Sequence, residues 1–271
     1  MPRSLPWALV ALALLAANVT RAQAADATLV SIATPRGAKQ AFILIKPAKP
    51  AVASVILFAG GHGALGLKGA SAMTWGAGNF LVRARDLFAA QDLMVAVIDA
   101  PSDKQGGMNG IFRMGAAHAA DIGAVAAYLK KQADVPVWLV GTSMGTFSAA
   151  GGAIAAKGVD GLVLTSTITR AKPDWKIAQS HRDGVASMAL PQVTVPTLIV
   201  SHRKDGCDIT PAADAPKLSK RLTNARKVET ALLDGGSPPQ SDPCEARSQH
   251  GFLGIESEAV ATIAKFVKAN P

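Results

Sequence analysis

The chain has 271 residues, of which 49% are hydrophobic and 17% are charged, and its formal net charge at pH 7 is +9. This length suits one α/β domain with a substantial buried core. The basic residues are scattered and form no long run or aromatic-interleaved patch, which argues against a nucleic-acid-binding protein.

The first residues have the pattern of an export signal. Arg3 supplies a positive start, residues 5–17 form an apolar core, and Ala22-Gln23-Ala24 is a small-residue cleavage site. The apolar core is shorter than the roughly 20 residues that a membrane-spanning helix needs, so a retained anchor is the less favoured interpretation. We therefore expect residues 1–24 to be a cleaved signal peptide and residues 25–271 to be a single domain that is periplasmic or secreted.

Short apolar runs alternate with longer helical patterns from residue 28 onward, which predicts βαβ units and a largely parallel sheet. Eight strands are expected, at residues 29–33, 42–46, 55–59, 94–99, 137–140, 162–165, 197–201 and 228–233. The first two are too close together to hold a helix between them, so we expect an antiparallel hairpin at one edge of the sheet. The predicted fold class is α/β, with a sheet covered on both faces.

The helical spacing of apolar residues predicts helices between these strands. They are expected at residues 80–90, 116–131, 144–156, 212–222 and 258–268, with Ser257 as the N-cap of the last. Between residues 166 and 190 the pattern dissolves into polar and charged residues. Loops of this length are uncommon in compact domains, so this segment is interpreted either as a small lid over a site or as a long surface loop.

A Gly-x-Ser-x-Gly pentapeptide, residues 141–145, follows the strand at 137–140 and opens the next helix. A strand, a glycine-flanked serine and a helix in this order are typical of a nucleophile elbow, which holds the serine in a strained conformation above the sheet edge. Side chains at Gly141 and Gly145 would collide with neighbouring backbone. Ser143 is therefore the candidate nucleophile, although the pentapeptide alone is equally compatible with an ordinary Gly/Ser turn.

A serine hydroxyl needs an imidazole to accept its proton and a carboxylate to orient that imidazole. His250 is the candidate base, because it lies between the last strand and the last helix and Gly251 leaves the backbone free to turn the ring inward. Asp205 follows the strand at 197–201 and is the candidate acid. Asp208 is the alternative acid, since a strand end is predicted only to within a few residues.

A glycine-rich turn, residues 60–63, follows the strand at 55–59. Backbone N–H groups in such a turn can point at a developing alkoxide. The amides of Gly61 and Met144 are the expected oxyanion hole, with the His62 amide as the alternative first donor. Four large side chains are candidates for pocket walls and equally for ordinary packing: Trp75, Met108, Phe112 and Trp175.

The chain has two cysteines, Cys207 and Cys244. In an exported protein they are expected to form one disulfide, which closes a loop of about 37 residues. A thiol nucleophile or a metal pair is the weaker alternative, because two ligands with no adjacent His cluster cannot complete a zinc site. No metal site is predicted. The bridge is expected to tie the loop of Asp205 to the loop of His250 and so to preserve their register.

With the glycine-rich turn, the pentapeptide around Ser143, the loop of Asp205 and the late His250-Gly251 pair in this order, the chain resembles the α/β-hydrolase superfamily over essentially all of residues 25–271. The likeness is greatest to exported bacterial hydrolases of the dienelactone-hydrolase-like and small-esterase type. The resemblance implies an eight-stranded sheet with one antiparallel strand, a minimal cap, a triad of Ser143, His250 and Asp205, and no cofactor. The oxyanion turn departs from the family, since many relatives have a His-Gly pair directly after the strand.

The expected function is a serine hydrolase that cleaves a carboxylic ester or a related acyl bond of a small-molecule substrate through an acyl-enzyme. Thioesters, lactones and peptides share this mechanism, so a thioesterase or serine peptidase is an alternative. A noncatalytic exported binding protein on the same scaffold is an alternative from another class, against which the presence of all three triad residue types argues. A dehydrogenase is discarded, because no Gly-x-Gly-x-x-Gly turn follows the first strand.

Overall fold

The computed structural model describes residues 26–271, so the predicted signal peptide lies outside the described residues. The eight strands are β1 (Asp26–Ala33), β2 (Lys39–Lys46), β3 (Ala53–Phe58), β4 (Leu93–Ile98), β5 (Val137–Ser143), β6 (Gly161–Thr167), β7 (Thr197–His202) and β8 (Val228–Leu233). They form one sheet in the order β1-β2-β4-β3-β5-β6-β7-β8. β2 is antiparallel to both of its neighbours, and every other adjacent pair is parallel. The predicted α/β class, strand number and edge hairpin are confirmed.

The helices are α1 (Phe80–Arg83), α2 (Arg85–Ala89), α3 (Gly110–Met114), α4 (Ala116–Gln132), α5 (Gly145–Ala155), α6 (Ala215–Arg221) and α7 (Glu256–Lys268). The single helix predicted at 80–90 is two short helices, because the backbone leaves the helical conformation at Ala84. The sequence pattern misses α3, which at five residues is too short for a periodic signal. In residues 26–271 no helix has the length and apolar character to cross a membrane.

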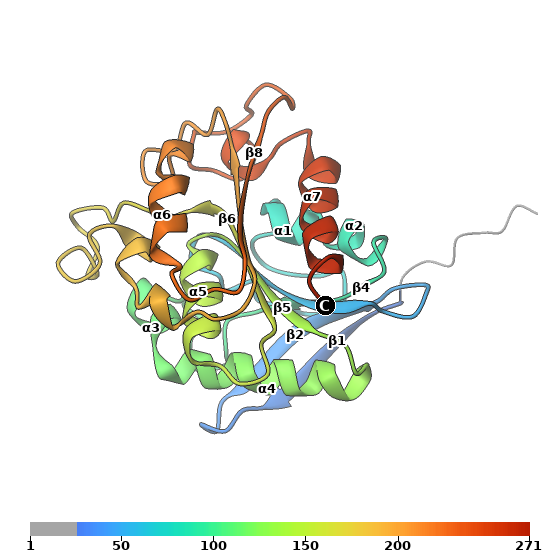
Figure 1. Cartoon of the computed structure of the whole chain (residues 1–271). Helices are drawn as coiled ribbons and strands as arrows, with labels where there is room; N and C mark the ends of the chain where they lie inside the picture. The colour runs from blue at the N-terminus through green and yellow to red at the C-terminus, as the bar shows by residue number, and fades with distance from the viewer. Residues whose placement is uncertain (1–25) are drawn as a thin grey trace, which may run out of the picture.

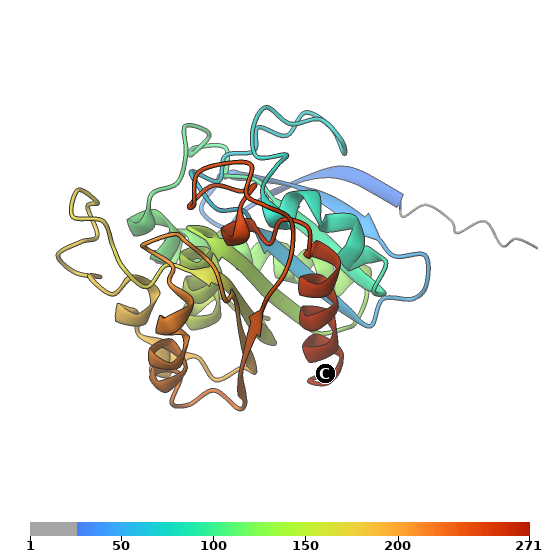
Figure 2. The ribbon, with the colours of Figure 1, turned by 90° about the horizontal axis from the view of Figure 1, so that it is seen from above.

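The helices cover both faces of the sheet. α4, α5 and α6 pack on one face, and α1, α2 and α7 pack on the other (Figures 1 and 2). Residues of β5 alternate between the two cores: Val137 and Leu139 face the first layer, whereas Trp138 and Val140 face the second. Because successive side chains of a strand point to opposite faces, a strand buried on both faces is apolar throughout, as the sequence of β5 is.

The start of α7 differs from the prediction. The helix begins at Glu256, its N-cap position is Ile255, and Ser257 lies inside the first turn. The carboxylate of Glu256 accepts a hydrogen bond from the Gly254 amide at 2.9 Å and pairs with Arg83 at 2.9 Å. An acidic side chain in the first turn also complements the positive end of the helix dipole, so Glu256 takes over the stabilisation that a serine N-cap would supply.

The segment between β6 and β7 has two distinct halves. Its second half contains the 3₁₀ turns η1 (Gly184–Ser187) and η2 (Leu190–Gln192), and Val185, Leu190 and Val193 are buried in the core beside α5. In its first half, residues 169–183, most residues are at least partly exposed. The part of the segment that remains a candidate lid is therefore this first half.

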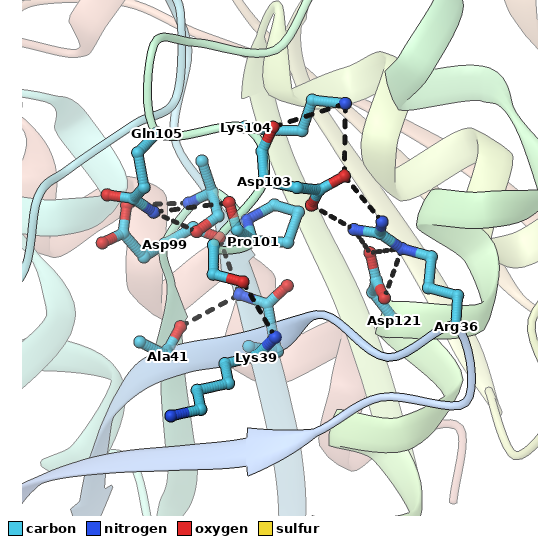
Figure 3. A network of polar contacts seen from close by, with 12 residues as sticks. Arg36, Lys39, Ala41, Asp99, Pro101, Asp103, Lys104, Gln105 and Asp121 are labelled. Atoms are coloured by element: carbon cyan, nitrogen blue, oxygen red, sulfur yellow. Dashed lines mark hydrogen bonds and ion pairs between the residues drawn. The ribbon is translucent and has the colours of Figure 1, made fainter.

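An ion-pair network fastens the β1–β2 hairpin to the body of the domain. Arg36 lies in the turn between these strands, and its guanidinium donates two hydrogen bonds to Asp103 at 2.8 Å and three to Asp121 of α4 at 2.8–2.9 Å (Figure 3). The Asp121 side chain is completely buried. Bidentate arginine–carboxylate pairs are among the stronger hydrogen-bonded contacts, so this network stabilises the hairpin edge of the sheet.

Candidate active site

The turn between β5 and α5 has the geometry of a nucleophile elbow. β5 ends at Ser143, α5 begins at Gly145, and Ser143 has a φ of +52°, a left-handed conformation that a serine adopts only at a cost. A Cβ on Gly141 would lie 2.5 Å from the Gly145 carbonyl oxygen, and a Cβ on Gly145 would collide with the Phe58 carbonyl. The two glycines are therefore required by the closeness of the backbone, as the pentapeptide predicts.

Ser143 and His250 line the same cavity, which has a volume of about 440 Å³. The predicted oxyanion residues Gly61 and Met144 line it as well. Further lining residues come from segments far apart in the sequence: Gly60, His62, Trp75, Gly76, Gly78, Asn79, Phe80, Thr142, Trp175, Ile209, Cys244, Glu245, Ala246 and Gly251. The fold thus brings the candidate nucleophile, the candidate base and both candidate oxyanion donors to one cavity.

His250 and Asp205 are in contact. The Nδ1 atom of His250 lies 3.1 Å from Oδ2 of Asp205, and the two side chains are 5% and 0% exposed. The Thr210 hydroxyl donates to the same carboxylate oxygen at 2.9 Å and lies 3.0 Å from the histidine Nδ1. A carboxylate at Nδ1 selects the tautomer with its proton on Nδ1, which leaves Nε2 as the proton acceptor.

The loops that carry these two residues are fixed by local contacts. Asp205 follows β7, and its second carboxylate oxygen accepts the amide of Cys207 at 3.0 Å. The backbone carbonyl of His250 accepts the Ser166 hydroxyl at 2.7 Å. Cys207 is disulfide-bonded to Cys244, as predicted, so the loop of Asp205 is covalently joined to the segment that leads to His250.

Asp208, the alternative acid, does not face the histidine. It is exposed, and its carboxylate lies 3.7 Å from the Cys244 sulfur. Cys207, Asp208 and Cys244 are close enough to resemble a metal site, with candidate ligand atoms within 4.8 Å of one another. Both sulfur atoms belong to the disulfide, however, and a metal ligand must be a thiolate. These residues therefore do not fit a metal ion in the disulfide-bonded protein.

The glycine-rich turn lies against the elbow. A Cβ on Gly60 would lie 3.0 Å from the Ser143 Cβ, and Gly61 has a φ of +55°. The carbonyl groups of this turn are bonded away from the cavity: that of Gly61 accepts Arg113 at 3.0 Å, and that of His62 accepts the Met108 amide at 2.8 Å. This leaves the amide side of the turn available to a ligand.

The segment that follows the glycine-rich turn is fixed by the buried carboxylate of Asp99, which directly follows β4. It accepts backbone amides at distances of 2.6–3.2 Å, from Leu65, Gly66, Leu67 and Ala100. Arg113 therefore holds the Gly61 carbonyl of the turn, and Asp99 holds the backbone amides that follow the turn. Neither side chain was singled out from the sequence, because a lone buried Asp or Arg has no motif.

The four candidate wall residues separate into two pairs. Trp75 and Trp175 line the cavity, and the Trp75 ring packs against the His62 ring with centroids 3.9 Å apart and ring planes tilted by 37°. Met108 is buried in a small separate cluster, and Phe112 packs beside it. A neighbouring cavity of about 290 Å³ shares Met144 and Trp175 with the first and is otherwise lined by Asn109, Gly110, Ile111, Asp174, Lys176 and Ile177.

Thr210 is a site residue that the sequence analysis missed. Its hydroxyl contacts both members of the Asp205–His250 pair, yet a threonine five residues after an acid has no recognisable signature. His118 is also notable, because it is completely buried and both ring nitrogens lack a hydrogen-bond partner among the described residues. Burial, followed by the charges of Arg113 and Arg36, lowers the pKa of His118 to about 3, so this ring is neutral at pH 7.

Comparison with solved structures identifies the architecture. An esterase from Pyrococcus furiosus matches with a TM-score of 0.61 and 15% identity, over 90% of this chain and 93% of that one. A protein from Agrobacterium tumefaciens described as a candidate α/β hydrolase matches with a TM-score of 0.55 and 12% identity, over 88% and 94% of the two chains. The chain has the α/β-hydrolase fold. The eight-stranded sheet with its single antiparallel strand is the arrangement that the resemblance implies.

Dipeptidyl peptidase 4 from Porphyromonas gingivalis contains the same α/β-hydrolase fold within a longer chain. It matches with a TM-score of 0.62 and 14% identity, over 92% of this chain but only 36% of that one. No protein-family model and no curated protein matches this sequence. At these identities the matches establish the fold alone, and the dienelactone-hydrolase-like subtype stays a prediction.

Proposed function

We propose that the protein is an exported serine hydrolase that cleaves a carboxylic ester of a small molecule. The observation that carries the proposal is the contact between His250 and the buried Asp205, made beside the cavity into which the strained Ser143 opens. An acid-oriented imidazole and a partly exposed elbow serine in one cavity are the parts that acyl transfer requires. The esterase fold of the Pyrococcus furiosus neighbour supports an ester as the first substrate to test.

In the proposed mechanism Ser143 attacks the acyl carbon while Nε2 of His250 accepts the hydroxyl proton. Asp205 at Nδ1 stabilises the imidazolium that forms. The amides of Gly61 and Met144 bind the oxyanion of the tetrahedral intermediate. His250 then returns the proton to the leaving alcohol, and a water molecule activated by His250 hydrolyses the acyl-enzyme.

The amides of an oxyanion hole stabilise the transition state because they already point at the position where negative charge develops on the substrate oxygen. Loss of one such donor typically lowers turnover about 100- to 1,000-fold. Export is part of the proposal, and the Cys207–Cys244 disulfide supports it, since disulfides persist mainly in oxidising compartments.

The decisive experiment is labelling of the disulfide-intact protein with a fluorophosphonate probe, read by intact mass. We expect one label per molecule, absent in Ser143→Ala and strongly slowed in His250→Ala. Ser219→Ala on α6 is a matched control outside the cavity and is expected to label like the unmodified protein. Hydrolysis of p-nitrophenyl butyrate should follow the same pattern across the variants.

A folded protein that takes no label would overturn the proposal and favour a noncatalytic binding protein on this scaffold. A labelled protein that cleaves an aminoacyl p-nitroanilide faster than the ester would instead favour a peptidase. The similarity of the fold to part of a dipeptidyl peptidase makes that second assay necessary.

A further inference from the structure

Arg113 is a buried cation with no carboxylate partner in residues 26–271. It is only 1% exposed, and it takes part in none of the ion pairs of this part of the chain. Burial lowers the pKa of the guanidinium to about 10, so it is still charged at neutral pH. A buried charge with no ion-pair partner costs desolvation free energy, so the polar groups around the guanidinium must offset that cost.

The guanidinium is surrounded by neutral oxygen atoms. It donates to the carbonyl groups of Gly61 at 3.0 Å, Ala59 at 3.5 Å and Met108 at 3.3 Å, and to the Ser148 hydroxyl of α5 at 3.0 Å. Gly61 belongs to the glycine-rich turn that follows β3, and Ala59 directly precedes this turn. The guanidinium of Arg113 therefore hydrogen-bonds mainly to backbone carbonyls in and beside the predicted oxyanion turn.

Bonding to the Gly61 carbonyl determines where the neighbouring amides point. In a trans peptide unit the C=O of one residue and the N–H of the next point in opposite directions, so the His62 amide points away from Arg113. Gly61 itself has a φ of +55°, a backbone conformation that favours glycine. Gly61 and His62 line the cavity and Arg113 does not, so the His62 amide, which is opposed to the Arg113-bound carbonyl, is inferred to face the cavity.

The helix that carries Arg113 is itself firmly placed. The Asn109 side chain caps α3 by accepting the Phe112 amide at 2.9 Å. A Cβ on Gly151 of α5 would lie 2.9 Å from the Arg113 carbonyl oxygen, so α3 and α5 pack with backbones nearly in contact. Because α5 begins directly after Ser143, α3 links the position of the turn to that of the candidate nucleophile.

We propose that Arg113 is a positioning residue for the oxyanion hole. It bonds the carbonyl groups of Ala59 and Gly61, turns the amide of His62, the alternative first oxyanion donor, toward the cavity and places a fixed positive charge behind it. The inference rests on the proposed serine hydrolase function and adds a residue that acts on the transition state without touching the substrate. Preorganised donors of this kind assist the transition state more than the bound substrate.

The test compares Arg113→Met, which removes all the donors, with Arg113→Lys, which retains the charge but not the planar fork. Arg36→Met is the matched control, because it removes a second arginine that is held by several hydrogen bonds but lies outside the cavity. Four quantities are measured: kcat and KM for p-nitrophenyl butyrate, the inhibition constant of a trifluoromethyl ketone, and the melting temperature. The ketone forms a tetrahedral adduct with an oxyanion and so reports on the hole itself.

For Arg113→Met we expect kcat to fall about 10- to 100-fold with KM within about threefold, and the ketone to bind weaker by the same factor as kcat/KM falls. For Arg113→Lys, both kcat and the affinity for the ketone should fall at least about fivefold. Arg36→Met should melt at a lower temperature with unchanged kcat and ketone affinity.

A folded Arg113→Met with unchanged kcat and ketone affinity would show that Arg113 is only structural and would overturn the inference. If Arg113→Met does not fold, an unchanged Arg113→Lys overturns it in the same way. Failure of the proposed function is a separate result, because it appears in the unmodified protein as an absence of both labelling and hydrolysis.

Discussion

Asp121 and Asp205 are carboxylates with completely buried side chains, in two different parts of the molecule. Asp121 on α4 accepts three hydrogen bonds from Arg36, whereas Asp205 after β7 faces His250 and the Thr210 hydroxyl. Arginine is permanently charged, but an imidazole gains and loses its proton near neutral pH. The first pair is suited to holding a hairpin in place, and the second to stabilising a charge that appears only during a reaction.

Arg36 and Arg113 differ between the two regions in the same way as these two carboxylates do. Arg36 is paired with two carboxylates at the hairpin edge of the sheet, and Arg113 is bonded to carbonyls beside the cavity. Side chains in the first region should therefore affect stability and leave turnover unchanged, while those in the second should affect turnover. Four predictions test this division.

The largest effect is expected at Asp205. Asp205→Asn keeps the shape of the side chain but removes the charge that stabilises the imidazolium, so kcat should fall about 1,000- to 10,000-fold with little change in the free energy of unfolding. Steady-state kinetics and urea unfolding measure the two quantities. Asp208→Asn is the control and should retain full activity. The opposite pattern would make Asp208 the catalytic acid.

Removal of the disulfide should affect both stability and activity. Cys207→Ser with Cys244→Ser opens a loop of 37 residues and should lower the free energy of unfolding by about 3–4 kcal/mol. Because the bridge joins the loops of Asp205 and His250, the rate per folded molecule should fall as well. Rates are compared at a temperature where both forms are fully folded, and equal rates would remove the catalytic role of the bridge.

Asp121 should affect stability alone. Asp121→Asn leaves Arg36 with one charged partner, Asp103, and should lower the free energy of unfolding by about 1–3 kcal/mol, because a hydrogen bond to a charged group in a buried site is lost. The kcat should be unchanged, since neither residue lines the cavity. A loss of turnover in this fully folded variant would break the division between the two regions.

The smallest effect on stability is expected at His118, whose pKa is lowered in part by the charges of Arg113 and Arg36. Its pKa in the folded protein is lowered to about 3, first by burial and then by Arg113 and Arg36. In the unfolded chain its pKa is about 6.5, so between these values only the unfolded state binds the proton. Stability should therefore fall as the pH drops below about 6.5, by up to about 1.4 kcal/mol per pH unit.

His118→Phe removes this titration. Its free energy of unfolding should resemble that of the unmodified protein at pH 7.5 and exceed it at pH 5, as measured by urea unfolding at both values. An equal loss of stability in the two proteins between these pH values would show that the acid sensitivity arises elsewhere.

Much of the sheet could be predicted because each strand has its own local signal. The central strands are continuous apolar runs, as burial on both faces demands, and the glycines of the elbow mark a turn that no larger residue fits. The start of α7 could not be predicted in the same way. Ser257 is a good local N-cap, but Glu256 bonds to Gly254 and to Arg83, which is distant in the sequence, and these contacts set the helix start.

The α/β class, the elbow around Ser143 and the chain order of the candidate acid and base can be predicted from the amino-acid sequence, because they depend on spacing and residue type along short stretches. The choice between Asp205 and Asp208 as the partner of His250, and the roles of Thr210, Asp99 and Arg113, are visible only in the folded protein. Hydrogen bonds act over about 3 Å, and residues far apart in the sequence come within that distance only when the chain is folded.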